Sequence, residues 1–310
     1  MTRIIAGATG LIGKRLVEHW LSQGHAIIVI GRSAEKIKNT FQDRVRAITW
    51  DQLTLDSLRG AEVVVNLTGA GVADKRWSAA RKQEIIDSRV IATQKIAGLL
   101  AELGRDSPPL LNASAIGIYG LQPEYMDDLH YRFDESRPID WENAPDFLSS
   151  VGRKWEKAAQ AAVAKNVRVV FMRFGVVLAK EGGALPQLVK PFHFYMGGII
   201  GSGGQPFSWV MLEDVLRAID FLLEKPTITG PVNIVAPNCV TQRELAETIG
   251  KILNKPVKMK IPDFILKMML GEMAQELIYQ GQHVYPQRLL DAGFHFVYPN
   301  IEVALRQALV

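Results

Sequence analysis

Apolar and polar positions along the chain follow two patterns, short apolar runs that indicate buried strands and helical spacings that indicate amphipathic helices. One helical pattern spans 11–23 and ends at Gly24, and a longer one spans about 78–103. Six strands, the fifth with a loop at its end, are predicted by the apolar runs at 3–6, 25–32, 45–50, 61–71, 109–120 and 167–175.

Strands that alternate with helices predict a parallel sheet with right-handed crossovers and helices on both faces. The run AEVVVN at 61–66 is almost continuously apolar, as a strand covered on both sides should be. The sequence therefore predicts an α/β protein, with a Rossmann-like doubly wound parallel sheet.

The pattern changes after residue 178, where Gly, Pro and aromatic residues become frequent. A helix and a strand within about 213–237 then return to the sheet. We therefore assign 1–178, together with this return segment, to a dinucleotide-binding domain. The remainder of 179–310 is expected to form a smaller substrate-side C-terminal domain.

Three features of the C-terminal part predict local structure. The segment GFHFVYP at 293–299 predicts a short strand, and the apolar run at 264–270 predicts a packed helix. Asp214, in LEDV, is expected to cap the helix that follows it.

Composition excludes several classes of function. The 310 residues are 48% hydrophobic, and 36 basic against 32 acidic residues give a net charge of +4. No run of Lys and Arg is interleaved with aromatics, so nucleic acid is not an expected partner. The small basic excess suits an anionic cofactor or a small-molecule substrate.

The single cysteine, Cys239, allows no internal disulfide and no cysteine-based zinc site. His193 belongs to no metal-ligand spacing, so no metal is expected. The N-terminal MTRIIAGATG lacks the apolar core of a signal peptide, and no stretch reaches the roughly 20 apolar residues of a membrane-spanning helix. We expect a cytoplasmic monomer or homodimer without membrane contact.

The first strand is followed by a G-x-x-G-x-x-G motif that opens the first helix, which is the context of a dinucleotide-binding loop. Glycines let the chain turn tightly and let a pyrophosphate approach the backbone, and the helix N-terminus attracts its charge. The alternative is a glycine turn used only for packing. The expected contacts are Gly7, Thr9, Gly10, Leu11, Ile12 and Gly13.

The end of the second strand discriminates between NAD and NADP. An NAD site usually has Asp or Glu there, whereas this chain has Arg32 followed by Ser33. A guanidinium can pair with a 2′-phosphate, so NADP(H) is the predicted cofactor, with Lys36 as a second cation. The alternative is a solvated arginine. Asp51 is placed either to meet the adenine amino group or to cap the next helix.

The fourth strand ends in NLTGAG, where Leu67, Thr68 and Gly69 are expected to flank the adenine-side ribose and the pyrophosphate. The long helix that follows carries Glu84 and Arg89. These two residues do not share one helical face, so only one of them is expected to look inward toward the cofactor. The alternative for each is a place on an outer charged face.

Three motifs, GATGLIG at 7–13, NASAIGIYG at 112–120 and MRFGVVL at 172–178, resemble the extended short-chain dehydrogenase/reductase superfamily of sugar-nucleotide epimerases and dehydratases. The chain is more similar to an atypical branch, the epimerase family proteins. That likeness runs from end to end, through NLTGAGVADKRW at 66–77, SRVIAT at 88–93, GGIIGSG at 197–203 and GFHFVYP at 293–299.

The resemblance implies an NADP(H)-dependent oxidoreductase or epimerase-like enzyme that acts on a small, sugar-like or carbonyl substrate. Superfamily members use a Tyr-x-x-x-Lys on the helix after strand five, where the tyrosine is the acid/base and the lysine lowers its pKa. If Glu156 is the glutamate that often follows this lysine, the two positions hold Leu148 and Gly152. Lys154 lies about 200° around the helix from Gly152 and cannot replace it.

Other residues are then candidates for the chemistry. Ser114, after strand five, either bonds a substrate carbonyl or is a turn serine, and Tyr119 either donates a proton or lines the pocket. By fold analogy, Val176 is expected near the carboxamide of the cofactor. Without the dyad, Glu84 and Arg89 are the nearest candidates to hold the nicotinamide ribose.

Two classes of function stay open at this point. The first is an enzyme with an unusual acid/base, which the intact substrate-side motifs favour. The second is an NADP(H)-binding sensor or partner-binding protein without turnover, which the missing dyad favours.

Overall fold

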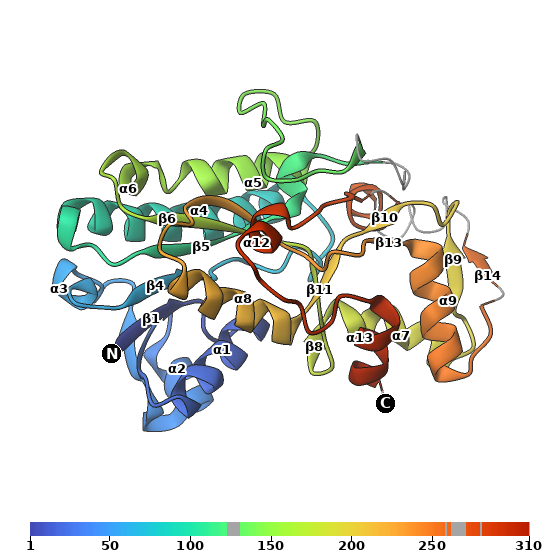
Figure 1. Ribbon diagram of the computed structural model, residues 1–310, viewed down its shortest axis with the longest axis horizontal. Helices are drawn as coiled ribbons and strands as arrows, with labels where there is room; N and C mark the ends of the chain where they lie inside the picture. Colours follow the sequence, from blue (N-terminus) through green and yellow to red (C-terminus); the bar gives the residue numbers. More distant parts are fainter. Residues whose placement is uncertain (123–130, 258, 262–270, 280, 310) are drawn as a thin grey trace.

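The structure is a computed structural model that describes residues 1–122, 131–257, 259–261, 271–279 and 281–309. The helix expected at 264–270 lies outside these residues. A seven-stranded sheet in the order β12-β6-β5-β4-β1-β2-β3 forms the centre of the molecule (Figure 1). All of its neighbouring strands run parallel, which confirms the Rossmann-like fold class.

Six strands of this sheet arise from the predicted apolar runs, and the seventh, β12, arises from the expected return segment. Except for β1, which also includes Thr2, these six strands are shorter than their runs. Polar residues and glycines at the carboxyl ends of the runs leave the sheet and form the connecting loops. The strands are β1 (Thr2–Ala6), β2 (Ala26–Gly31), β3 (Arg46–Thr49), β4 (Val63–Asn66), β5 (Leu110–Ala115), β6 (Val169–Phe174) and β12 (Gly230–Ile234).

Helices cover both faces of the sheet and bury two separate apolar clusters against it (Figure 1). One face carries α1 (Leu11–Ser22), α2 (Ala34–Phe41) and α8 (Leu212–Glu224). The opposite face carries α3 (Leu55–Leu58), α4 (Ala79–Leu103), α5 (Phe147–Lys157) and α6 (Gln160–Ala164). Because both faces are covered, the central strands lie fully inside, as their apolar runs predicted.

The C-terminal part packs around a third apolar cluster, formed largely by three helices. These helices are α7 (Ala184–His193), α9 (Gln242–Leu253) and α13 (Ile301–Leu309). Small sheets connect this cluster to the centre, in the orders β11-β7-β8, β10-β13 and β14-β9. Their strands are β7 (Val176–Ala179), β8 (Gly182–Gly183), β9 (Gly198–Ile200), β10 (Pro206–Phe207), β11 (Trp209–Met211), β13 (Val240–Thr241) and β14 (Met259–Ile261).

The described chain also contains the 3-10 turns η1 (Gln42–Arg44) and η2 (Gly104–Asp106) and four further short elements. The four further elements are the 3-10 turn η3 (Ile116–Tyr119), the helices α11 (Glu272–Ala274) and α12 (Gln287–Asp291), and the π-helical turn η5 (Gln275–Tyr279). The expected return segment is present, because α8 packs against α1 and β12 pairs with β6. The proposed domain boundary at residue 178 stays a prediction.

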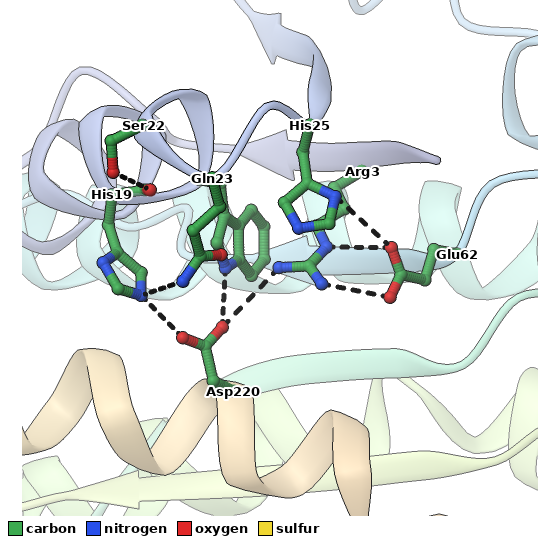
Figure 2. A network of polar contacts seen from close by, with 8 residues as sticks. Arg3, His19, Ser22, Gln23, His25, Glu62 and Asp220 are labelled. Atoms are coloured by element: carbon green, nitrogen blue, oxygen red, sulfur yellow. Dashed lines mark hydrogen bonds and ion pairs between the residues drawn. The ribbon is translucent and has the colours of Figure 1, made fainter.

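A polar network joins α8 to the amino edge of the sheet (Figure 2). Arg3 on β1 donates to both carboxylate oxygens of Glu62, at 2.9 and 3.0 Å, and lies 3.6 Å from Asp220 on α8. The Trp20 indole donates to the same Asp220 at 2.7 Å, and His19 Nε2 lies 2.6 Å from it. A cavity of about 320 Å³ adjoins the network. It lies at the edge opposite to the strand ends where such folds bind ligands.

The prediction of a strand at 293–299 is wrong. This segment contains neither helix nor strand. Its aromatic residues pack as individual rings, with Phe294 edge-on to both Phe296 and Phe221 of α8, at centroid distances of 4.8 and 5.3 Å. The alternation of apolar residues therefore reflects packing on a helix rather than pairing with a strand.

The prediction that Asp214 caps α8 is also wrong. The side chain is fully buried and accepts the backbone N–H groups of Val297 and Tyr298, at 2.8 and 2.9 Å. α8 begins after Met211 without a side-chain cap. Asp214 therefore pins the C-terminal segment to the helix that returns to the sheet.

Asp214→Ala should lower the free energy of unfolding by about 1–3 kcal/mol, because two backbone donors lose a buried acceptor. Chemical denaturation followed by circular dichroism measures this change. Asp43→Ala is the control, because Asp43 is exposed and pairs with Lys38 at 3.6 Å. The control should change stability by less than about 0.5 kcal/mol. Equal effects of the two variants would contradict the role of Asp214.

Candidate cofactor and substrate site

The glycine turn after β1 packs backbone against backbone. Gly7 has φ +78°, and a Cβ there would lie 2.7 Å from the carbonyl carbon of Leu67, at the end of β4. At Gly13, on the first turn of α1, a Cβ would lie 2.6 Å from Ala8 Cα. A side chain at either position would push the turn away from the sheet, so both glycines are sterically required.

Gly10 differs from these two glycines because a Cβ there would meet no close contact. It precedes α1 and is exposed, and the nearest atom to a Cβ would be the Gly7 carbonyl oxygen, at 3.5 Å. No side chain in the described part of the chain caps α1, so its first N–H groups lack a side-chain acceptor there. Thr9, Leu11 and Ile12 are partly buried around this point. The arrangement suits an anion at the helix N-terminus, as predicted for the pyrophosphate.

Arg32 is exposed directly after β2 and donates no hydrogen bond to the residues that the structure describes. Ser33 caps α2 by accepting the Lys36 N–H at 3.1 Å, and the Lys36 side chain is exposed. An unbonded guanidinium, a hydroxyl and a helix N-terminus thus meet at the end of β2. All three favour a phosphate group.

Asp51 lies in an exposed turn after β3. It does not cap the next helix, because Thr54 and Ser57 form the capping box of α3. A hydrogen bond from Thr49 holds the pKa of Asp51 below its usual value, so the carboxylate is an acceptor at neutral pH. The predicted contact with an adenine amino group therefore remains open, whereas the capping alternative is wrong.

The loop after β4 is held by a buried amide. Asn66, the last residue of β4, donates to Thr93 Oγ1 at 2.9 Å and to Asn112 Oδ1 at 2.7 Å. The side-chain oxygen Oδ1 of Asn66 accepts the Thr68 N–H at 3.2 Å. Leu67, Thr68 and Gly69 therefore leave the sheet in a fixed direction, next to the glycine turn.

The structure shows which of Glu84 and Arg89 points inward, a choice that the sequence left open. Arg89 is 9% exposed, and its Nη1 donates to the carbonyls of Ala70 and Ile85, at 3.0 and 2.9 Å. Glu84 is exposed and accepts from Arg81 at 2.7 Å. Arg89 therefore lies beneath the loop after β4, while Glu84 belongs to the outer charged face.

Leu148 and Gly152, the positions assigned to the usual dyad, lie on α5. A Cβ at Gly152 would be 2.9 Å from Ile118 Cβ, so the η3 turn occupies the space beside this position. Lys154 is exposed. The structure thus agrees with the argument from helical geometry that Lys154 does not take the place of Gly152.

Ser114 and Tyr119, the predicted catalytic residues, belong to one buried polar network. The Ser114 hydroxyl donates to Glu156 at 2.7 Å, and Glu156 forms a two-pronged ion pair with Arg173, at 2.8 Å for each bond. Arg173 Nη1 donates to the Tyr119 hydroxyl at 2.9 Å, and Tyr119 donates to Asn233 at 2.9 Å. Both hydroxyls therefore have internal partners.

Burial raises the pKa of Tyr119 to about 12, although Arg173 opposes this shift. A phenol with such a pKa exchanges protons poorly near neutral pH. The network therefore favours the alternatives that the sequence left open, a structural serine and a tyrosine that packs beside the pocket. One signal in the sequence pointed to the network, since Arg173 interrupts the apolar run of β6 and a buried charge needs a partner.

Val176 begins β7 rather than lying in a loop. Its N–H donates to the Ser208 carbonyl at 2.9 Å and is not available to a cofactor. Gly175, between β6 and β7, has no room for a side chain, because a Cβ would lie 2.8 Å from Val235 Cγ1. The predicted contact of Val176 with the carboxamide therefore depends on its carbonyl or its side chain.

Nothing in the sequence singled out Glu276. This residue of η5 accepts the N–H groups of Phe147 and Leu148 at the start of α5, at 3.2 and 2.8 Å. A second contact joins the same regions, because Lys82 of α4 forms an ion pair with Glu272 at 2.5 Å. No local pattern could reveal these contacts, because the partners lie far apart in the chain.

A membrane-spanning helix would have to be longer and more apolar than any found in the described ranges. The described residues also contain no group of three or more His, Cys, Asp or Glu side chains arranged to hold a metal ion.

The parallel sheet, the glycine turn and the uncapped helix beside it define a dinucleotide-binding protein of the Rossmann-like class. The chain belongs to the NAD dependent epimerase/dehydratase family, whose model matches residues 3–235. Residues 261–308 match a second model, described as a domain of unknown function (DUF1731).

Several known proteins are similar to this chain over its whole length. It is 37% identical to the chloroplastic epimerase family protein SDR39U1 homolog of Arabidopsis thaliana, over 99% of this chain and 86% of that one. It is 34% identical to the epimerase family protein YfhF of Bacillus subtilis, over 100% and 98% of the two chains. The crystal structure of the human epimerase family protein SDR39U1 with NADPH superimposes with a TM-score of 0.84, at 28% identity and 99% coverage of both chains.

Tyr119→Phe should lower the free energy of unfolding by about 1–3 kcal/mol, because Asn233 and Arg173 lose a buried partner. The difference in absorbance between the wild type and the variant, recorded against pH, reports the ionisation of Tyr119. It should show a phenol that ionises near pH 12 rather than near 10. Since the unfolded phenol ionises first, stability that depends on Tyr119 should decline as the pH rises from about 10 to 12. A phenol that ionises below pH 9 would contradict the structural role.

Proposed function

We propose that this protein binds NADP(H) along the carboxyl edge of its sheet and acts as an oxidoreductase or epimerase-like enzyme on a small carbonyl or sugar-like substrate. The observation that carries the proposal is the glycine turn. Gly7 and Gly13 pack against backbone, whereas Gly10, at the uncapped start of α1, is exposed and would meet only one atom, at an ordinary contact distance, with a Cβ. This geometry suits a pyrophosphate and serves no evident packing role at Gly10.

The neighbouring residues extend this site in both directions. Arg32, Ser33 and the start of α2 would hold the 2′-phosphate, and the loop of Leu67, Thr68 and Gly69 would flank the adenine-side ribose and the pyrophosphate. A bound nicotinamide would supply or accept a hydride. The human relative that was crystallised with NADPH supports this choice of cofactor, because the two chains match over nearly their full lengths.

The protein's own acid/base is proposed to differ from the usual Tyr-x-x-x-Lys. Leu148 and Gly152 carry no proton donor, and the Tyr119 hydroxyl is bonded to Arg173 and Asn233. Arg89 is the cation that lies beside the loop after β4. We propose that it orients the nicotinamide-side ligands, with Glu84 too exposed to assist directly.

A binding protein without turnover is the second candidate function. The specific observation in its favour is Ile118, which fills the space beside Gly152 and leaves no room for a lysine. Hydride transfer discriminates between the two functions. An enzyme should oxidise NADPH in the presence of some member of a panel of small aldehydes, ketones and keto sugars, whereas a sensor should bind NADPH without consuming it.

Wild-type protein should bind NADPH at least about tenfold tighter than NADH, as one charged contact of about 1.4 kcal/mol would give. Arg32→Ala should remove most of this difference, because it removes the partner of the 2′-phosphate. Calorimetric titration measures both affinities. Arg105→Ala, an exposed arginine at the opposite edge of the sheet, should leave them unchanged. Equal affinity of the wild type for the two cofactors would refute the assignment.

Arg89→Ala should weaken NADPH binding measurably, and Lys154→Ala should not. Arg89 lies beneath the loop after β4, whereas Lys154 is exposed on α5. Quenching of protein fluorescence by NADPH measures the two dissociation constants, and thermal melts check that both variants fold. The opposite ranking would mean that Lys154 is a displaced active-site lysine.

A further inference from the structure

One edge of the Arg89 guanidinium is unused. Both hydrogen bonds of this side chain come from Nη1, to the carbonyls of Ala70 and Ile85. Nε and Nη2 donate to none of the residues that the structure describes, yet neither is among the fully enclosed atoms. These two nitrogens present parallel N–H groups, the fork that a carboxylate accepts side-on.

The positive charge of Arg89 is also unmatched within the described part of the protein. Among the described residues, no carboxylate forms an ion pair with it, and the charge that acts on it most is the neighbouring cation Arg81. Burial, followed by the charge of Arg81, lowers the pKa of Arg89 to about 10, which still leaves it charged at neutral pH. Buried charges in proteins are normally paired, because an unpaired one loses its hydration without compensation.

The planar guanidinium of Arg89 is packed between the loop after β4 and an aromatic ring. A Cβ at Gly69 would lie 2.9 Å from Arg89 Cζ, so the loop after β4 rests directly against the charged group. Arg89 Cζ also lies 4.9 Å from the centre of the Trp155 ring, whose indole N–H donates to Thr93 at 3.2 Å. The aromatic ring stabilises the cation without neutralising it. The free edge is therefore pre-oriented for a ligand.

The proposed cofactor does not supply the missing anion. Its phosphates are assigned to the start of α1 and to Arg32, and the nicotinamide ribose and carboxamide are neutral. The oxidised nicotinamide ring is itself positive and would repel Arg89. A ribose hydroxyl can accept one hydrogen bond from Arg89, but it leaves the charge unmatched.

We infer that the substrate carries a carboxylate and that Arg89 binds it through the Nε–Nη2 edge, beside the nicotinamide. This inference rests on the proposed function and narrows its substrate class to small carbonyl or hydroxy compounds with a carboxylate. The carboxylate neutralises Arg89, and so it also removes the repulsion between Arg89 and the oxidised ring. Carboxylate and NADP⁺ should therefore strengthen each other's binding.

The test measures the affinity of NADP⁺ for the whole protein in the presence of glycolate or of its neutral amide, glycolamide, with ionic strength held constant by sodium chloride. Glycolate should tighten NADP⁺ binding at least about fivefold relative to glycolamide, the lower end of usual coupling between sites. Arg89→Gln should abolish the difference, and Arg89→Lys should keep the charge but lose most of the effect, because lysine lacks the planar fork.

Two further variants keep the test decisive. Lys154→Gln, an exposed cation on α5, should behave as the wild type. Gly69→Ala keeps Arg89 but places a methyl group against its Cζ, and should reduce the glycolate effect. Equal effects of glycolate and glycolamide on the wild type, or a glycolate effect that survives Arg89→Gln, would overturn the inference. A stronger effect of inorganic phosphate than of glycolate would overturn the choice of a carboxylate.

The failure of the inference can be told apart from the failure of the proposed function. Wild-type protein that binds NADP⁺ and NADPH but shows no preference for glycolate refutes only the inference. Wild-type protein that binds neither nucleotide refutes the proposed function, and the inference with it.

Discussion

Direct contact between backbones at the carboxyl ends of β1 and β4 is the constraint on which the site depends. Gly7 touches the chain at Leu67, and Gly13 lets α1 lie against Ala8. These approaches, each impossible with a side chain, bring the start of α1 and the loop after β4 to one point. The helix N-terminus can then face an anion while the same loop reaches Arg89. The same steric packing therefore positions both the proposed cofactor site and Arg89.

The described residues contain two kinds of buried charge, one that is paired inside the protein and one that is not. Arg173 and Glu156 satisfy each other fully, and they tie Ser114, Tyr119 and Asn233 into a network that joins β5, β6, α5 and β12. A satisfied network of this kind is rigid and costly to open. Arg89, by contrast, is buried without an anionic partner among the described residues. The charges of the first arrangement neutralise each other inside the fold, whereas the charge of Arg89 is the one that we propose binds a ligand.

The C-terminal part does more than cover the sheet. Glu276 binds the first N–H groups of α5, and Asp214 on α8 holds the segment at Val297 and Tyr298. Each contact lets a carboxylate satisfy backbone donors of a distant segment, which is stronger than a bond between neutral groups. The C-terminal part is therefore attached through the first turns of α5 and α8.

The order of strands and helices, the glycine turn and Arg32 at the end of β2 were determined by the sequence itself, because apolar period, glycine spacing and strand ends are local properties. Tertiary structure alone decided which charged side chains turn inward. Glu84 and Arg89 share one helix, yet only Arg89 is buried. The hydroxyl of Ser114 found a partner on α5 and that of Tyr119 found partners on β6 and β12. Phe294 and Phe296 pack ring against ring beside α8 instead of lying in a strand. Such choices depend on neighbours that are remote in the chain, which no local pattern encodes.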